Sequence, residues 1–291
     1  MGAVSSVDFR AEWAALLRRR PVLAPSLRIY GAVLEAWAAW APEAVVPLAW
    51  GHARCSACWE RGVPLLAEAP PPCAPADLEP LLGAVMEALA TLGPGLAAPL
   101  QRFAEAWDRS EVALEALLPA PGRLGSPEAE TRLGLTPGFP GFLAVASLRP
   151  VLDAYFAGTR PHLGDAWALG ICPFCGAPPA WADLVEDGHR RLACHLCGAG
   201  WRVPRLACSY CGSLDAKDAV RLQAEGADEG YGIAACGRCQ GYLKELDRRV
   251  RWNAGAALVE DWGSPHLDLV AERKGYWRGV PTLVQLQPSH P

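Results

Sequence analysis

The sequence lacks the features that would place the protein in a membrane or on nucleic acid. Its formal net charge of -4 leaves no basic excess for binding nucleic acid or an anionic bilayer by bulk electrostatics. Its most apolar stretch, residues 36–50, is broken by two prolines and a glutamate before it reaches the length of a transmembrane helix. Charged residues between positions 8 and 12 interrupt the core that a secretory signal would need. We therefore expect a cytoplasmic protein that does not insert into membranes.

The sequence also lacks a recognisable catalytic machinery. No nucleophile–base constellation, phosphate-binding loop or dinucleotide fingerprint stands out along the 291 residues. Half of the residues are hydrophobic and a fifth are charged, which is typical of a folded protein rather than a disordered one. The length allows two or three domains, each with its own core. We expect a globular protein that is not an enzyme.

Cysteine is what the sequence has in abundance. Eight of the eleven cysteines form four consecutive C-x-x-C pairs in the second half of the chain. They are Cys172, Cys175, Cys194, Cys197, Cys208, Cys211, Cys236 and Cys239. In a reducing compartment, thiols clustered in this way indicate metal ligands rather than disulfides. Four successive pairs predict two metal ions per chain, each bound by four thiolates.

The spacing of the pairs predicts how they combine. The intervals between them are 18, 10 and 24 residues. Hairpins within the two longer intervals would bring the first pair to the second and the third pair to the fourth. A cross-braced arrangement, first with third and second with fourth, is the alternative. In either case a site with four sulfurs has no open coordination position, which disfavours hydrolytic metal catalysis. The residues alone do not separate zinc from a rubredoxin-like single iron.

The three remaining cysteines lie in the first half. Cys55 and Cys58 form one more C-x-x-C pair, with His52 and Cys73 nearby. They could make a third site, but one pair on a helical background favours structural thiols. His195 lies within the second of the four pairs, and because each site already has four sulfurs we interpret it as a non-ligand.

The periodicity predicts an α+β protein. Apolar residues recur at helical spacing in the first half, which predicts an N-terminal α-helical bundle with a long connection over residues 119–141. The predicted helices cover residues 7–20, 26–40, 77–92, 96–118 and 140–157. Two hairpins then accompany the cysteines, with strands at 180–185, 190–194, 219–224 and 231–235. A C-terminal helix is indicated by Ser264 as cap and Pro265 at its first position, with Leu267, Val270 and Ala271 on one face.

These elements suggest three domains. Residues 1–166 would form the helical domain, residues 167–207 a first rubredoxin-like or zinc-ribbon-like module, and residues 208–291 a second module with the C-terminal helix.

Residues 171–247 closely resemble the formate dehydrogenase accessory protein family FdhE. The likeness rests on the run CPFCGAPP at 172–179, the four pairs in order, and the run GYLKELD at 241–247. Glu260 and Asp261, residues 266–271 and the run GYWRG at 275–279 agree with the end of that family, although the Asn expected shortly afterwards is missing between Gly279 and Leu283. Cys55 and Cys58 belong to no pattern of the family.

The resemblance implies a role in maturation. Members of the family act in the cytoplasm on the catalytic subunit of respiratory formate dehydrogenase and are described as binding iron through the paired cysteines. It therefore implies iron, with zinc as the alternative, at the eight cysteines, and that subunit as the partner. A homodimer is left open. Because the cysteine sites are closed and no catalytic constellation stands out, we expect recognition of another protein through exposed aromatic residues near the pairs and the end of the sequence, for which Tyr210, Tyr242, Tyr276 and Trp277 are the candidates.

Two alternatives from other classes remain. A rubredoxin-like electron carrier or thiol redox protein would use the same ligands with a metal that cycles, or with a pair left free of metal. A zinc-ribbon protein that binds nucleic acid would need a basic surface, yet residues 167–252 contain eleven Lys and Arg against ten Asp and Glu. We therefore expect no nucleic-acid partner.

Overall fold

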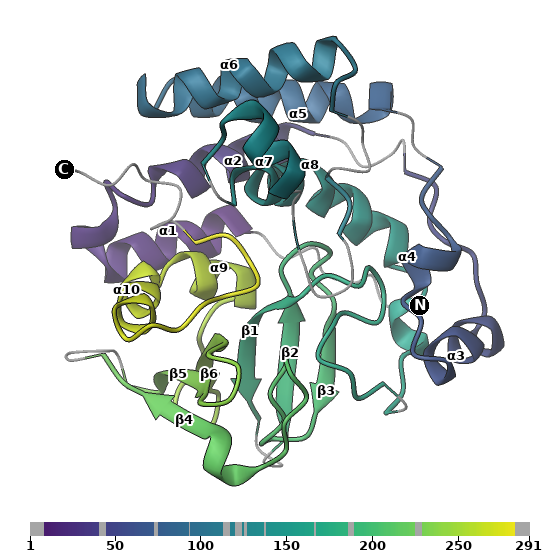
Figure 1. Ribbon diagram of the computed structural model, residues 1–291, viewed down its shortest axis with the longest axis vertical. Helices are drawn as coiled ribbons and strands as arrows, with labels where there is room; N and C mark the ends of the chain where they lie inside the picture. The colour runs from purple at the N-terminus through teal and green to yellow at the C-terminus, as the bar shows by residue number, and fades with distance from the viewer. Residues whose placement is uncertain are drawn as a thin grey trace.

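The computed structural model describes residues 9–40, 45–72, 75–92, 94–112, 117–119, 124, 127–136, 138–165, 167–185, 189–224 and 229–282. Figure 1 shows helices from the first half of the chain above a sheet built by the second half, with the last helices, in yellow, between the two. Among the helices described, none combines the length and apolar character that crossing a bilayer requires.

The first half forms the helical layer. Its α-helices are α1 (Phe9–Arg19), α2 (Arg28–Ala39), α3 (His52–Glu60), α4 (Leu65–Glu68), α5 (Pro75–Ala90), α6 (Pro94–Asp108), α7 (Pro127–Leu133) and α8 (Phe139–Phe156). A short 3-10 helix, η4 (Arg160–His162), follows them. Helix α8 is buried on nearly every side, as a helix that is apolar all round should be, and it lies at the centre of this layer.

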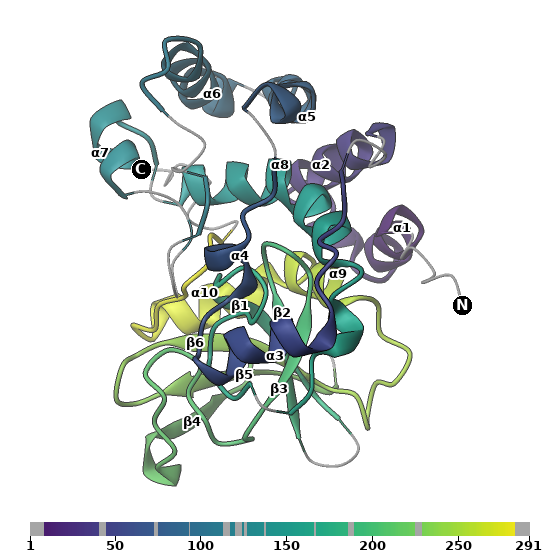
Figure 2. The same cartoon turned by 90° about the vertical axis from the view of Figure 1, so that its right-hand side faces the viewer.

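All five helices predicted in the first half are present, but several details differ. Helix α6 ends at Asp108, ten residues before the predicted end. The stretch predicted to be a long connection contains α7, whose Ala129 is buried. Helices α3 and α4 were not predicted. These short helices span at most nine residues each, too few turns for a helical period to show in the sequence. Figure 2 shows α3 beside the sheet, away from α5 and α6.

One six-stranded sheet carries the cysteine pairs. Its strands are β1 (Pro179–Leu184), β2 (Arg190–Cys194), β3 (Gly200–Val203), β4 (Ala219–Leu222), β5 (Tyr231–Cys236) and β6 (Tyr242–Asp247). The spatial order is β3-β2-β1-β6-β5-β4. Neighbours are antiparallel except β1 and β6, which are parallel, with Trp181 opposite Lys244 and Leu184 opposite Asp247. Both predicted hairpins, β1 with β2 and β4 with β5, are therefore present, but they are joined through β6, which lies between β1 and β5. Strands β3 and β6 were not predicted.

Two helices end the described chain, α9 (Ala257–Trp262) and α10 (Pro265–Arg273). Helix α10 is the predicted one and begins at Pro265, with Leu267 and Ala271 buried. The predicted cap is wrong in its chemistry: the Ser264 hydroxyl donates to the carbonyl of Glu260 at 2.7 Å and makes no capping bond. The Ser264 side chain therefore satisfies a carbonyl near the C-terminal end of α9 and accepts no hydrogen bond from the first amides of α10.

Helix α9 also connects the two halves of the chain. The Trp262 ring stacks on Tyr30 of α2 with ring centroids 4.4 Å apart, and it meets Trp13 of α1 edge-on. These rings belong to a hydrophobic core that runs from the helical layer to the first cysteine pairs. The predicted α+β class, with N-terminal helices, two cysteine clusters and a C-terminal helix, is confirmed.

Candidate metal centres

Four turns of the same design present the cysteines. In the first, the Cys172 amide donates to Ala177 O and the Gly176 amide to Cys172 O, both at 2.9 Å, so the backbone folds tightly around the side chain. Glycine is needed here because the residue has a φ of 77°, in the left-handed region. Gly198 and Gly212 do the same after the second and third pairs. After the fourth pair Gln240 takes this conformation at φ 59°, since the glycine of that pair lies between the two cysteines.

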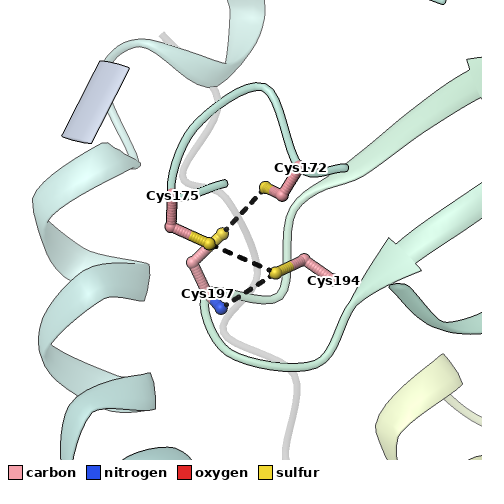
Figure 3. Close-up of side chains that lie close together, drawn as sticks. All are labelled: Cys172, Cys175, Cys194 and Cys197. Atoms are coloured by element: carbon pink, nitrogen blue, oxygen red, sulfur yellow. Dashed lines mark hydrogen bonds between the residues drawn. The ribbon is translucent and has the colours of Figure 1, made fainter. Parts of the chain in front are cut away.

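The first cysteine group consists of Cys172, Cys175, Cys194 and Cys197. Figure 3 shows the four sulfurs pointing to a common centre. Sγ of Cys172 lies 3.5 Å from Sγ of Cys197, and Sγ of Cys175 lies 3.4 Å from Sγ of Cys194. A tetrahedral ion with metal–sulfur bonds of about 2.3 Å would separate its sulfurs by roughly 3.8 Å. A disulfide would need about 2 Å. The spacing therefore fits a metal ion and not a disulfide.

The second cysteine group consists of Cys208, Cys211, Cys236 and Cys239. Its sulfurs approach in the same pattern, with 3.6 Å between Cys208 and Cys239 and 3.8 Å between Cys211 and Cys236. In both groups all ligand atoms lie within 4.8 Å of one another. The pairs therefore combine first with second and third with fourth, and the cross-braced arrangement is not the one adopted.

The two groups differ in exposure. All four cysteines of the first group are buried, enclosed between the sheet and the helical layer. In the second group Cys211 is exposed and Cys208 and Cys239 are half-buried, leaving Cys236 as the one buried member. Burial raises the pKa of the Cys172 and Cys175 thiols well above the usual range. Because metal binding requires thiolates, an ion in the first group would displace the protons that these two thiols otherwise keep.

Two arginines from the helical layer hold the backbone of the first group. Nη1 of Arg149 in α8 donates to the carbonyl of His195 at 2.8 Å, and Nη2 of Arg160 in η4 donates to the carbonyl of Cys197 at 2.7 Å. Arg149 lies so close to Gly198 that a Cβ there would be 2.6 Å from its guanidinium. The arginines place positive charge beside a site that carries about two negative charges when four thiolates hold a divalent ion. Neither arginine was predicted, because no sequence motif links positions 149 and 160 to the cysteine pairs.

The cysteines of the first half are not part of a third site within the described residues. Cys55 and Cys58 are both buried on α3 in the hydrophobic core, and no described group of potential ligands includes them. The Cys58 sulfur accepts a long contact from Arg61 at 3.9 Å. Cys73 lies outside the described residues. The burial of Cys55 and Cys58 suits structural thiols, and that role stays a prediction.

Part of the chain is similar in sequence to proteins named as FdhE homologs. No family model matches the chain. An FdhE homolog of Stutzerimonas stutzeri is 38% identical over 125 residues, 41% of this chain and 39% of the relative. One of Pseudomonas putida is 32% identical over 152 residues, 48% of this chain and 46% of the relative. The matches thus span less than half the length of these relatives.

The fold extends the likeness to nearly the whole chain. The crystal structure of the FdhE protein from Pseudomonas aeruginosa aligns with a TM-score of 0.65 over 97% of this chain and 96% of that one, at 23% identity. The sequence matches show similarity to FdhE proteins over part of the chain, and the crystal structure shows that the fold is shared over nearly all of it. The resemblance predicted from the cysteine pairs and their flanking runs is therefore confirmed.

The runs that resemble FdhE meet in a buried ionic cluster. Nζ of Lys244 in β6 lies 2.9 Å from Asp261 and 2.7 Å from Asp268. Arg278, beyond α10, pairs with the same two carboxylates, at 3.0 Å to Asp268. Tyr242 completes the cluster by donating to Asp268 at 2.9 Å. The FdhE-like runs thus supply two cations and two anions that neutralise one another inside the protein.

The ionic cluster reaches both cysteine groups. His195, within the second cysteine pair, lies 3.6 Å from Asp261, and burial lowers its pKa to about 3, so that it is neutral. Burial would raise the pKa of Asp261, but Arg278 and Lys244 more than offset this and the pKa falls. On the other side Tyr210, in the third pair, donates to the Tyr242 carbonyl at 3.3 Å.

The predicted aromatic surface is only partly present. Tyr242 is 1% exposed, so the expectation that it marks a docking surface is wrong: its ring and hydroxyl are used by the ionic cluster. Tyr210 and Tyr276 are half-buried. Trp277 is 46% exposed and its ring lies 4.8 Å from that of Tyr210. Of the four candidates, Trp277 is thus the exposed one, and Tyr210 and Tyr276 are partly accessible.

Proposed function

We propose that the protein is an accessory factor that binds the catalytic subunit of respiratory formate dehydrogenase in the cytoplasm and assists its maturation. The observation that carries this proposal is the pair of four-cysteine groups within a fold shared with FdhE over nearly the whole chain. The named relatives support a link to formate dehydrogenase. A non-catalytic role is supported by the closed character of both groups, which leaves no position for a substrate on a metal ion.

In this proposal the eight cysteines hold two metal ions, iron under anaerobic conditions and zinc in its place during heterologous expression. The ions would stabilise the turns or sense redox conditions. The division into residues 1–166, 167–207 and 208–291 belongs to the same proposal. The cysteines of each group span only 26 and 32 residues, 172–197 and 208–239, too few for a core that folds unaided, so the ions would contribute directly to folding.

Metal analysis tests the first part. Anaerobically purified protein is expected to contain two ions per chain, and Cys172→Ser and Cys208→Ser are each expected to lower that number by one. Cys58→Ser is the matched control, because its thiol is buried but lies outside both groups. One ion or none in the unsubstituted protein would contradict the assignment.

Capture of the partner tests the second part. Tagged protein is expected to retain the formate dehydrogenase catalytic subunit from cells that make the enzyme, and cells without the protein should accumulate inactive enzyme. Trp277→Ala is expected to weaken capture, because this side chain is exposed beside the second cysteine group. Its indole also donates to the Cys239 carbonyl, so capture is compared only between samples in which two bound ions are confirmed. Leu269→Ala, which removes an exposed side chain on α10, is the control. Undiminished capture by the Trp277 variant would remove that surface from the proposal.

A rubredoxin-like electron carrier is the second candidate. The exposure of Cys211 favours it, because an accessible sulfur places the second group within reach of a redox partner. Iron-loaded protein would then cycle reversibly and turn over rapidly with a reductase. A spectrum that does not change with reductant would exclude this candidate and leave the accessory role intact.

A further inference from the structure

A cavity beside the second cysteine group contains a buried arginine. The cavity has a volume of about 210 Å³ and lies between strands β4 to β6 and the segment that leads to Cys208. Arg190 of β2 and Glu245 of β6 lie in its lining, together with apolar side chains that include Leu184 and Leu206. It is separate from the ionic cluster, none of whose four charged residues lines it.

The guanidinium of Arg190 has one edge without hydrogen-bond partners. The residue is 5% exposed, and its Nη1 donates to Ala207 O at 3.4 Å. Nε and Nη2, which together form the side-on edge, have no hydrogen-bond partner among the described residues. The carboxylate of Glu245 is 3.9 Å from Nη2, too far for a hydrogen bond, and it is engaged by Arg221 at 3.0 Å. Two buried donors are therefore left over.

The surroundings of Arg190 leave its guanidinium only partly compensated. Glu245 lies between Arg190 and Arg221 but is within hydrogen-bond distance of Arg221 alone. The charged residues of the lining balance, with Arg190, Arg205 and Arg221 against Asp215, Asp218 and Glu245, so the unpartnered guanidinium edge, and not an excess of positive charge, favours an anion. Burial lowers the pKa of Arg190, although Glu245 and Cys208 oppose the shift. Leaving charged donors buried without partners is costly, and an anion bound at the free edge would remove that cost.

We propose that this cavity binds a carboxylate, which accepts two parallel hydrogen bonds from Nε and Nη2 of Arg190. A planar guanidinium edge matches the two oxygens of a carboxylate, and such bidentate pairs are among the stronger hydrogen bonds in proteins. The cavity is smaller than the roughly 300 Å³ at which pockets for drug-sized ligands begin. Its ligand is thus a small aliphatic acid or one acidic side chain of a peptide, with the carbon chain against Leu184 and Leu206.

Calorimetric titration of the full chain, purified anaerobically and matched for metal content, tests the proposal. The probes are propionate against propionamide, and acetyl-Gly-Glu-Gly-amide against the same peptide with Gln. A charged probe is expected to bind at least tenfold more tightly than its neutral counterpart. Binding of propionate alone identifies a free acid as the ligand, and binding of the Glu peptide alone identifies an acidic segment.

Substitutions place the binding at Arg190. Arg190→Met should abolish binding, and Arg190→Lys should weaken it at least tenfold because an ammonium group cannot offer two parallel donors. Arg191→Met is the matched control: Arg191 is the next residue of β2, is exposed, and does not line the cavity. Equal affinity for charged and neutral probes, no binding of either carboxylate, or unchanged affinity in Arg190→Lys would each overturn the proposal. The comparison of probes on the unsubstituted chain decides the question even if Arg190→Met does not fold.

Discussion

The buried ionic cluster makes a quantitative prediction for Arg278→Met. Lys244, Arg278, Asp261 and Asp268 carry two positive and two negative charges and are each at most 7% exposed. Removing the Arg278 guanidinium leaves two carboxylates facing one ammonium, and it also removes the hydrogen bond to the carbonyl of Ala180 in β1. Breaking a buried ion pair in this way costs about 3–5 kcal/mol. We expect the free energy of unfolding to fall by about that amount.

Urea unfolding followed by tryptophan fluorescence measures this loss, with metal content held equal. Thermal unfolding gives a second measure of the same loss. In a chain of this size, each kcal/mol lowers the melting temperature by about 2 °C, so a decrease of roughly 6–10 °C is expected. Arg273→Met provides the control, because Arg273 is exposed at the end of α10 and should change stability by about 0.5 kcal/mol or less.

A double substitution separates charge balance from lost packing. Arg278→Met combined with Asp268→Asn leaves Lys244 and Asp261 as a neutral pair 2.9 Å apart. The loss in free energy of unfolding of the double variant should therefore be about 1–3 kcal/mol smaller than the sum of the two single losses. Additive losses, or a cost below about 1 kcal/mol for Arg278→Met alone, would refute the view that the charges of the cluster depend on one another.

Two further predictions concern acid and chelation. The charged groups Lys244, Arg278 and Asp268 and the neutral His195 face Asp261, whose folded pKa is depressed because the two cations outweigh its burial. Its contribution is therefore present above the unfolded value of about 3.9 and is lost as pH falls through the lower folded value, so urea unfolding should show stability declining below about pH 4; a flat profile there would contradict the assignment. A chelator should remove the ion of the exposed second group well before the ion of the buried first group. Metal release followed over time measures this, and a single release phase would show that exposure does not control the rate of release.

The sequence was most informative where chemistry imposes spacing. Four C-x-x-C pairs separated by 18, 10 and 24 residues predict the adopted combination, because a four-sulfur site requires two turns to meet and only the longer intervals hold a hairpin. Strands β3 and β6 were missed for opposite reasons. The first has only four residues, and the second buries Lys244 and Glu245, which pattern analysis assigns to solvent.

Long-range neighbours were beyond the reach of the sequence. The parallel pairing of β1 with β6 brings together residues more than sixty positions apart, and no turn between them signals it. Arg149 reaches the backbone of the second cysteine pair from α8 in the same way. Tyr242 was misjudged because a tyrosine beside a metal-binding turn has no sequence pattern that separates a docking residue from a buried hydrogen-bond donor. Its hydroxyl donates to Asp268, which comes 26 residues later.

The segment after α10 supports the second cysteine group without contributing a ligand, and this leads to a last prediction. The indole of Trp277 donates to the carbonyl of Cys239 at 2.7 Å, and the amide of Gly279 donates to the Tyr210 hydroxyl at 3.1 Å, so the segment joins the third and fourth cysteine pairs. A Cβ at Gly279 would lie 2.7 Å from the Tyr210 ring and 3.2 Å from Pro178. Gly279→Ala should therefore displace the ring and loosen the turn that carries Cys208.

The expected result is faster loss of one ion to a chelator, with the second ion retained as in the unsubstituted protein, because the first cysteine group is buried and held by other residues. Gly275→Ala is the matched control: a Cβ there meets no atom within 4 Å, so its cost is limited to the strain of a φ of 82°. Equal rates of metal release from the Gly279 and Gly275 variants would show that the segment does not support the site. A faster rate in Gly279→Ala alone would show that the exposed second group retains its metal partly through a contact with the segment after α10, and not through its four cysteines alone.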